Sequence, residues 1–167
     1  MSATGKVLAI ASILLGCVSP CFAKGNGPAA FDKIKSLSGE WVGKDPDGLP
    51  ATITYHVTSG DTAILETLKP GKHPEMLSVY HLDGDHIMLT HYCSRNNQPR
   101  MRVEDYDPAS DKMVFEFKDV TNVGPNDSGH INGLVVKFPD KDHLVQEWSW
   151  KEGSDQSSSV FQFERKK

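Results

Sequence analysis

Hydrophobic and polar residues alternate in short runs along most of this chain, and turn residues separate the runs. Alternation of this kind is typical of β-strands with one buried face. The runs are "EWVGK", "ATITYHVTS", "AILETLK", "MLSVYHL", "HIMLTHYC", "RMRVEDY", "MVFEFKDV", "HINGLVVKF", "HLVQEWSW" and "SSVFQFER". The pattern therefore predicts an all-β protein of about ten strands.

Helical spacing occurs only before these runs. Phe31, Ile34 and Leu37 lie on one face of a short predicted helix that ends at Gly39. The later connections are too short for parallel crossovers, so the strands form an antiparallel meander. A sheet of this size curls and leaves exposed edges, and closure removes them. We expect an up-and-down barrel with one N-terminal helix.

Composition adds constraints on the partners. The chain has 167 residues, enough for one domain, and a formal net charge of -4 without a basic run. Nucleic acid is therefore not an expected partner.

The first 23 residues have the features of a secretory signal peptide. Lys6 precedes the apolar stretch "VLAIASILLGCV", and Ala23 ends a small-residue cleavage site. The apolar stretch is too short for a permanent membrane span. We expect removal of residues 1–23, a flexible lead-in at 24–30, and a domain at 31–167 that is periplasmic or secreted.

A second processing route is open. "LLGC", ending at Cys17, resembles a bacterial lipobox, although Leu15 stands where a smaller or β-branched residue is usual. This route would anchor the domain to a membrane through a lipid. Cleavage after Ala23 would instead leave Cys93 as the one cysteine, so no internal disulfide is expected.

The two ends of the domain resemble a known superfamily. "SGEWVG" opens the first strand and "FQFER" closes the last. A Gly-x-Trp opening with a basic residue on the last strand resembles the calycins, which include lipocalins, fatty-acid-binding proteins and nitrobindin-like barrels. The resemblance implies that Arg165 lies over Trp41 at the closed end of the barrel, where it can stack on the indole ring.

Longer stretches are similar to a lipocalin-like family of exported bacterial proteins without an established activity. They are "GEWVGKDPDG", "YHLDGDHIMLTHYC", "NQPRM", "FKDVTN" and "QEWSW". The likeness runs from Phe31 to Arg165 and implies a barrel with an interior pocket. Nitrobindin-like barrels bind haem through a late histidine. His130 and His143 lie in that region without matching the motif, so no cofactor is predicted and haem stays an alternative.

Candidate site residues come from the hairpin between Met76 and Cys93. A two-residue turn at Asp83-Gly84 or Gly84-Asp85 gives the same assignment of faces. The predicted interior face holds Met76, Ser78, Tyr80, Leu82, Ile87, Leu89, His91 and Cys93. Buried polar groups need each other, water or a ligand.

The predicted ligand is a small apolar or amphipathic molecule inside the barrel. The candidate contacts are Ser78, Tyr80, Leu89, His91, Cys93, Gln98, Arg100 and Arg102. The two arginines alternate with Met101 and Val103. They either face solvent beside acids such as Glu104, or face inward as a fork for a carboxylate.

Other readings of the same residues remain open. The barrel could be packed shut as a structural or interaction module of the envelope. His91 and Cys93 could serve a cryptic enzyme, although no motif supplies an orienting group or an oxyanion hole. The same pair could bind a metal but offers only two ligands, fewer than zinc usually takes.

Overall fold

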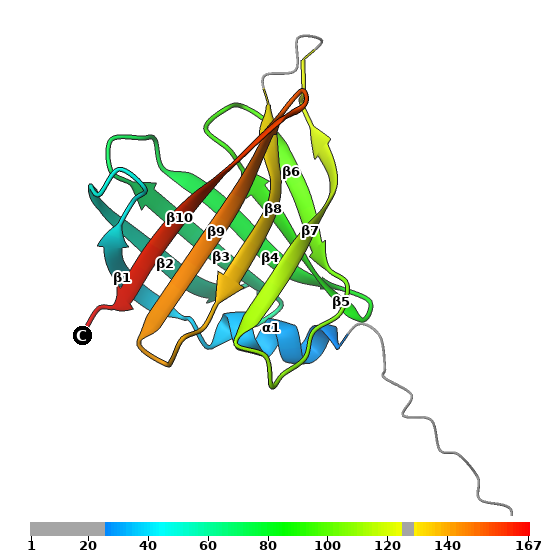
Figure 1. The fold of residues 1–167 in the computed structure, drawn as a ribbon. Helices are drawn as coiled ribbons and strands as arrows, with labels where there is room; N and C mark the ends of the chain where they lie inside the picture. Colours follow the sequence, from blue (N-terminus) through cyan, green and yellow to red (C-terminus); the bar gives the residue numbers. More distant parts are fainter. Residues whose placement is uncertain (1–25, 125–128) are drawn as a thin grey trace, which may run out of the picture.

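The protein folds as a closed antiparallel β-barrel with one short helix (Figure 1). The structure is a computed structural model that describes residues 26–124 and 129–167. Its elements are α1 (Gly27–Lys35), β1 (Gly39–Lys44), β2 (Pro50–Thr58), β3 (Ala63–Pro70), β4 (Met76–Asp83), β5 (His86–Tyr92), β6 (Gln98–Val103), β7 (Lys112–Thr121), β8 (His130–Lys137), β9 (His143–Glu152) and β10 (Asp155–Arg165). Each strand pairs with its neighbours in sequence, and β1 pairs with β10 to close the barrel. This confirms the predicted meander barrel.

The alternation of the sequence is the alternation between core and surface. In β5, Ile87, Leu89 and His91 are buried, and the residues between them are less buried. The β4–β5 register pairs Asp83 with His86, so the turn is Gly84-Asp85. A two-residue turn is what the predicted interior face requires, because strand side chains alternate between the two faces and the turn length decides which residues share a face.

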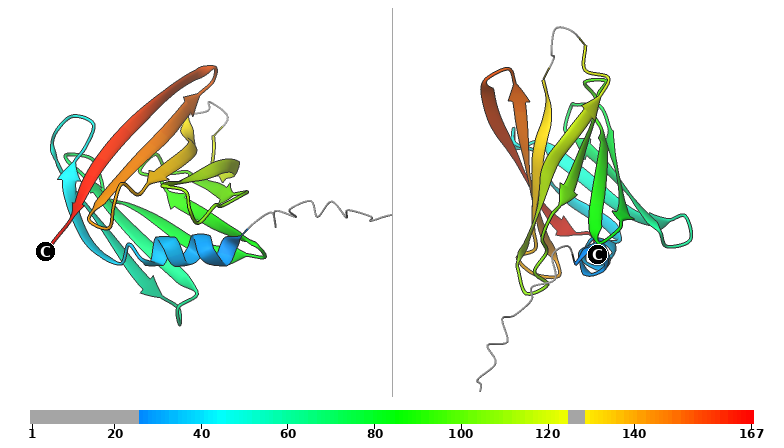
Figure 2. Two further views of the ribbon diagram at one scale, coloured as in Figure 1. Left: turned by 60° about the horizontal axis from the view of Figure 1, so that its bottom comes forward. Right: turned by 90° about the vertical axis from the view of Figure 1, so that its right-hand side faces the viewer.

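Helix α1 lies across one end of the barrel, and the β9–β10 turn lies at the other (Figure 1; Figure 2, right). The helix begins at Gly27, within the stretch at 24–30 that the sequence suggested as a lead-in. Pro28 suits the first helical turn because its fixed φ is already helical. The Gly27 amide donates to the Asp85 carbonyl at 2.8 Å, and a Cβ on Gly27 would lie 2.6 Å from the Asp85 backbone. This glycine lets α1 dock on the β4–β5 turn.

Trp41 and Arg165 sit beside α1, and we call this end the closed end. The two residues are register partners on β1 and β10, and the Arg165 guanidinium lies 4.1 Å from the centre of the Trp41 ring. Arg165 donates hydrogen bonds to the carbonyls of Ser36, Ser38 and Lys141. Trp41 donates from Nε1 to the Leu37 carbonyl at 2.8 Å. This is the arrangement that the resemblance to calycins implied.

The opposite end, which we call the open end, is formed by the β1–β2, β3–β4, β5–β6 and β9–β10 turns. The predicted signal peptide at 1–23 and the alternative lipid anchor at Cys17 lie outside the described residues. Within the described ranges, no helix is long and apolar enough to cross a membrane.

Candidate functional site

A buried carboxylate lies in the middle of the barrel. Glu66, on β3, is completely buried because it shares an inward face with Ile64 and Leu68. Its Oε2 accepts hydrogen bonds from the Tyr80 hydroxyl at 2.6 Å and from Gln146 Nε2 at 2.8 Å. Buried polar groups of this kind are stable only with partners, and Glu66 has them on both oxygens.

Ser78 links the carboxylate to a histidine. The Ser78 hydroxyl donates to Glu66 Oε1 at 3.2 Å, and Ser78 Oγ lies 3.0 Å from His91 Nδ1. The His91 ring in turn packs against the Trp148 ring, with 4.7 Å between the ring centres. A continuous chain of contacts therefore runs from Glu66 through Ser78 and His91 to Trp148.

A second branch of the network involves Gln146. Its Nε2 also donates to the Tyr55 hydroxyl at 2.8 Å, and its Oε1 accepts from Trp148 Nε1 at 2.9 Å. Strands β2, β3, β4, β5 and β9 thus each contribute a side chain to one polar network across the barrel. The network fills the middle of the barrel and separates the core beside α1 from the open end.

Burial shifts the protonation equilibria of this network. It raises the pKa of Glu66, although hydrogen bonds from Tyr80, Tyr55, Gln146 and Ser78 oppose the shift. Burial and the nearby Glu66 carboxylate raise the pKa values of Tyr55 and Tyr80 well above the usual value for tyrosine. Burial lowers the pKa of His91 to about 4, so its imidazole is neutral near pH 7.

A cavity of about 220 Å³ lies between this network and the open end. Its lining is mostly apolar and consists of Leu68, Met76, His91, Ile131, Trp148, Trp150, Ser157, Ser159 and Phe161. It adjoins a wider hollow of about 510 Å³ at the barrel mouth, with which it shares Met76, Ile131, Trp150, Ser159 and Phe161. An apolar cavity with a few polar groups at one end is typical of a small-molecule site.

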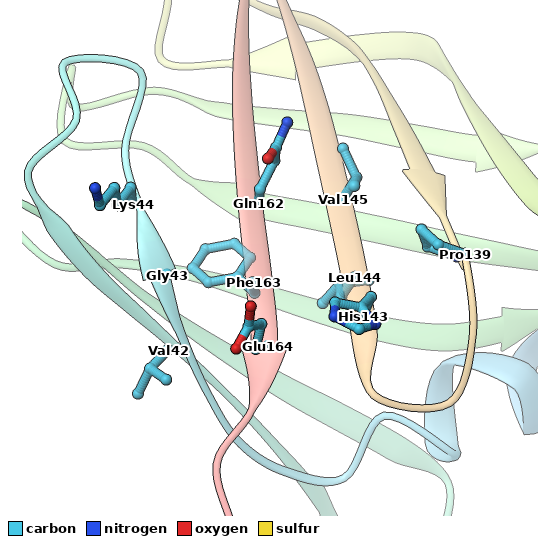
Figure 3. A pocket seen from close by; sticks show the side chains of 10 residues that line it. All are labelled: Val42, Gly43, Lys44, Pro139, His143, Leu144, Val145, Gln162, Phe163 and Glu164. Carbon is cyan, nitrogen blue, oxygen red and sulfur yellow. The ribbon is translucent and has the colours of Figure 1, made fainter.

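Another hollow, of about 660 Å³, lies on the outer wall. Residues of β1, β9 and β10 surround it, and Val42, Gln162 and Glu164 among them are exposed (Figure 3). His143 lies here and contacts Asp140 through Nδ1 at 2.8 Å. No side chain of the interior network lines this hollow, so we place the candidate site inside the barrel.

The predicted residues of the β4–β5 hairpin occupy different depths. Ser78, Tyr80 and His91 are buried members of the network. Leu89 is also fully buried but does not line the cavity. Cys93 lies beyond the end of β5 and lines the hollow of about 510 Å³ at the barrel mouth. Of the predicted ligand contacts on this hairpin, His91 lines the cavity, where it is joined by Met76 of the predicted interior face.

The predicted contacts on β6 lie on the outer wall, which corrects the inward arginine fork. Pro99, Met101 and Val103 take the inward positions. Three outward partners hold the polar residues: Arg100 donates to Asp119 at 2.6 Å, Arg102 donates to Glu104, and Gln98 accepts from Thr121. The alternation of β6 places its three apolar residues in the core, so the charged side chains face solvent.

In the part of the chain that the structure describes, His91 and Cys93 are not brought together as the enzyme and metal alternatives require. Across residues 26–124 and 129–167, no hydrogen bond joins Cys93 to His91, and no group of three or more His, Cys, Asp or Glu side chains could hold a metal ion. His130 packs its ring against Phe117 at 4.9 Å between centres, away from the cavity lining.

Three central residues were missed from the sequence: Glu66, Tyr55 and Gln146. A signal existed for Glu66 and for Gln146. In "AILETLK", Glu66 has Ile64 and Leu68 two residues away on either side, and Gln146 lies between Leu144 and Trp148 in the same way. A polar residue flanked by apolar residues at these spacings belongs to the buried face of a strand.

Comparison of the chain with protein-family models and with curated protein sequences finds no match.

Proposed function

We propose that this protein is an exported, lipocalin-like barrel that binds a small apolar or amphipathic molecule without catalysis. The single observation that carries the proposal is the cavity of about 220 Å³ above the Glu66 network. Its walls supply apolar surface from Trp148, Trp150 and Phe161, and its floor supplies one polar group from His91. Burial of apolar ligand surface would drive binding, at about 25 cal/mol per Å².

The geometry narrows the ligand relative to the sequence-based expectation. With Arg100 and Arg102 on the outer wall, the interior lacks the arginine fork that would favour an anionic amphiphile. The barrel is also filled from α1 to the Glu66 network by buried side chains. A long acyl chain has no room there, and a compact molecule at the open end is favoured.

Two serine variants on β10 test the proposal with a matched control. Both serines are exposed, but Ser159 lines the cavity, whereas its neighbour Ser158 lines neither the cavity nor the hollow at the barrel mouth. Ser159→Trp should fill the cavity and abolish binding of a small aromatic probe such as ethylbenzene, measured by calorimetry. Ser158→Trp should leave binding unchanged. Equal binding by both variants would place the probe outside the cavity, and no binding by the unmodified protein would indicate a barrel packed shut.

Export is supported by the N-terminal sequence and has its own test. The intact mass of the protein purified from its host should correspond to a chain that begins at Lys24. A chain that begins at a lipidated Cys17 would support the anchored form, and an uncleaved chain would contradict export. Native mass spectrometry of the same sample should reveal a bound small molecule.

A further inference from the structure

One nitrogen at the floor of the cavity has no partner. His91 contacts Ser78 through Nδ1, and no side chain or backbone group of the described residues bonds to its Nε2. The His91 ring lines the cavity between Leu68 and Trp148. A polar atom in an apolar cavity is poorly solvated, so a ligand group that bonds to it gains affinity and orientation.

The hydrogen bonds of the Glu66 network determine whether His91 Nε2 donates or accepts a hydrogen bond. Glu66 receives two donors at Oε2, from Tyr80 and Gln146, and the Ser78 hydroxyl donates to Oε1. An ionised carboxylate only accepts, and these three bonds match that state. When the single hydrogen of the Ser78 hydroxyl is directed at Glu66, His91 Nδ1 carries a proton and donates it to Ser78. The neutral imidazole then has a lone pair at Nε2.

We propose that the cavity selects an uncharged, flat molecule with a hydrogen-bond donor, such as a substituted phenol, whose hydroxyl donates to His91 Nε2. This inference rests on the proposed function and names the ligand class of the same site. The ring of the ligand lies among Trp148, Trp150 and Phe161, where aromatic surfaces favour a flat partner.

Size and charge agree with this class. An apolar cavity of about 150 Å³ holds benzene, so about 220 Å³ accommodates a ring with a short substituent. No Lys or Arg is among the described residues that line the inner cavity, and the Glu66 carboxylate lies two hydrogen bonds away. A ligand carboxylate would be buried there without a cation, which is unfavourable.

One substitution at Glu66 should reverse the preference for a ligand that donates a hydrogen bond. In Glu66→Gln, the Tyr80 and Gln146 donors still point at one position, so the new amide places its oxygen there and its NH₂ group toward Ser78. The Ser78 hydroxyl then donates to His91 Nδ1, and the ring proton moves to Nε2. The same cavity would now favour a ligand that accepts a hydrogen bond. Glu66 and Ser78 are thus positioning residues for His91.

Three probes of similar size test the proposal on the full-length mature protein. They are para-ethylphenol, which donates, acetophenone, which accepts, and ethylbenzene, which does neither. We expect para-ethylphenol to bind about tenfold tighter than ethylbenzene, the effect of one good hydrogen bond. We expect Glu66→Gln to reverse the order of para-ethylphenol and acetophenone. Calorimetric dissociation constants give both results.

Two further measurements keep the test decisive if Glu66→Gln does not fold. The ¹⁵N chemical shifts of His91 should show the proton at Nδ1 in the unmodified protein. His91→Phe should abolish the preference for para-ethylphenol while ethylbenzene still binds. Equal binding of the three probes, or a proton at Nε2 in the unmodified protein, overturns the ligand class but leaves the binding function intact. Failure of every probe to bind contradicts the proposed function itself.

Discussion

The two ends of the barrel treat their polar groups in opposite ways. At the closed end, Arg165 donates to three carbonyls and stacks on Trp41, which bonds to Leu37. At the open end lie three fully enclosed side-chain atoms of the described residues that have no hydrogen-bond partner within the protein. They are Asp45 Oδ2, Asn97 Oδ1 and His130 Nδ1.

The positions of these three atoms follow the topology. Asp45 is in the β1–β2 turn, Asn97 is in the β5–β6 turn, and His130 begins β8, all at the mouth of the barrel. Buried polar groups without a partner cost about 1–3 kcal/mol each, so these three atoms add no stability to this end. The comparison teaches that the closed end holds the fold together, whereas the open end holds the cavity.

The largest expected difference in stability between the two ends comes from replacing one tryptophan at each end. Trp41 is 1% exposed, so Trp41→Ala should lower the free energy of unfolding by about 3–5 kcal/mol through the cavity that it leaves. Trp150→Ala removes a half-buried ring from the cavity wall and should cost about 1–2 kcal/mol. Urea denaturation measures both. Equal losses would contradict the assignment of stability to the closed end.

A pH titration should show an effect of about 3 kcal/mol from His91. Its pKa is about 4 in the folded protein against 6.5 for free histidine, and each unit is worth about 1.4 kcal/mol. The unfolded chain therefore binds a proton between these values while the folded protein does not. This contribution to stability is complete above pH 6.5 and is lost as the pH falls toward 4.

The raised pKa of Glu66 acts in the opposite direction, because a protonated Glu66 favours the folded state as the pH falls. We therefore compare variants within the same Glu66 background. Relative to the unmodified protein, His91→Phe should lose less stability between pH 6.5 and 4. His56→Gln, at an exposed position on β2, should follow the unmodified protein. Parallel curves for all three would show that His91 titrates normally.

Sequence reasoning succeeded where periodicity alone decides the outcome. The strand pattern and short turns predicted the closed meander, and the parity of the Gly84-Asp85 turn predicted that Ser78, Tyr80 and His91 share the interior. These are local properties, because side chains alternate strictly along a strand. The resemblance to calycins supplied the long-range pair, Trp41 with Arg165.

The site was less accessible to sequence reasoning because its partners come from strands far apart in the chain. Gln146 meets Glu66 across 80 residues and Tyr55 across 91, and no local pattern encodes such contacts. On β6, the face of Arg100 was left open because its neighbours Met101 and Val103 allowed two readings. The acid that pairs with it, Asp119, is on the next strand.

A smaller effect is expected from the arginine of the closed end. Arg165→Met keeps most of the apolar stem but removes three hydrogen bonds to carbonyls and the contact with the Trp41 ring. We expect a loss of about 2 kcal/mol in the free energy of unfolding, since each such interaction contributes about 0.5–1.5 kcal/mol and they share one side chain. Arg165→Lys should recover only part of it, because an ammonium cannot reproduce the planar fork.

The smallest effect should come from Arg100, which serves as the matched control for Arg165. Arg100 also makes two short hydrogen bonds, but its partner Asp119 is an exposed carboxylate on the outer wall. Water and salt screen such pairs, so Arg100→Met should change the free energy of unfolding by less than about 1 kcal/mol and leave probe binding unchanged. Urea denaturation at low and high salt measures the first effect, and calorimetry with ethylbenzene measures the second. A loss as large as that of Arg165→Met would mean that the hydrogen bonds, and not the contact with the Trp41 ring, determine what an arginine contributes to this barrel. Weakened probe binding would instead indicate that Arg100 contributes to the ligand site despite its position on the outer wall.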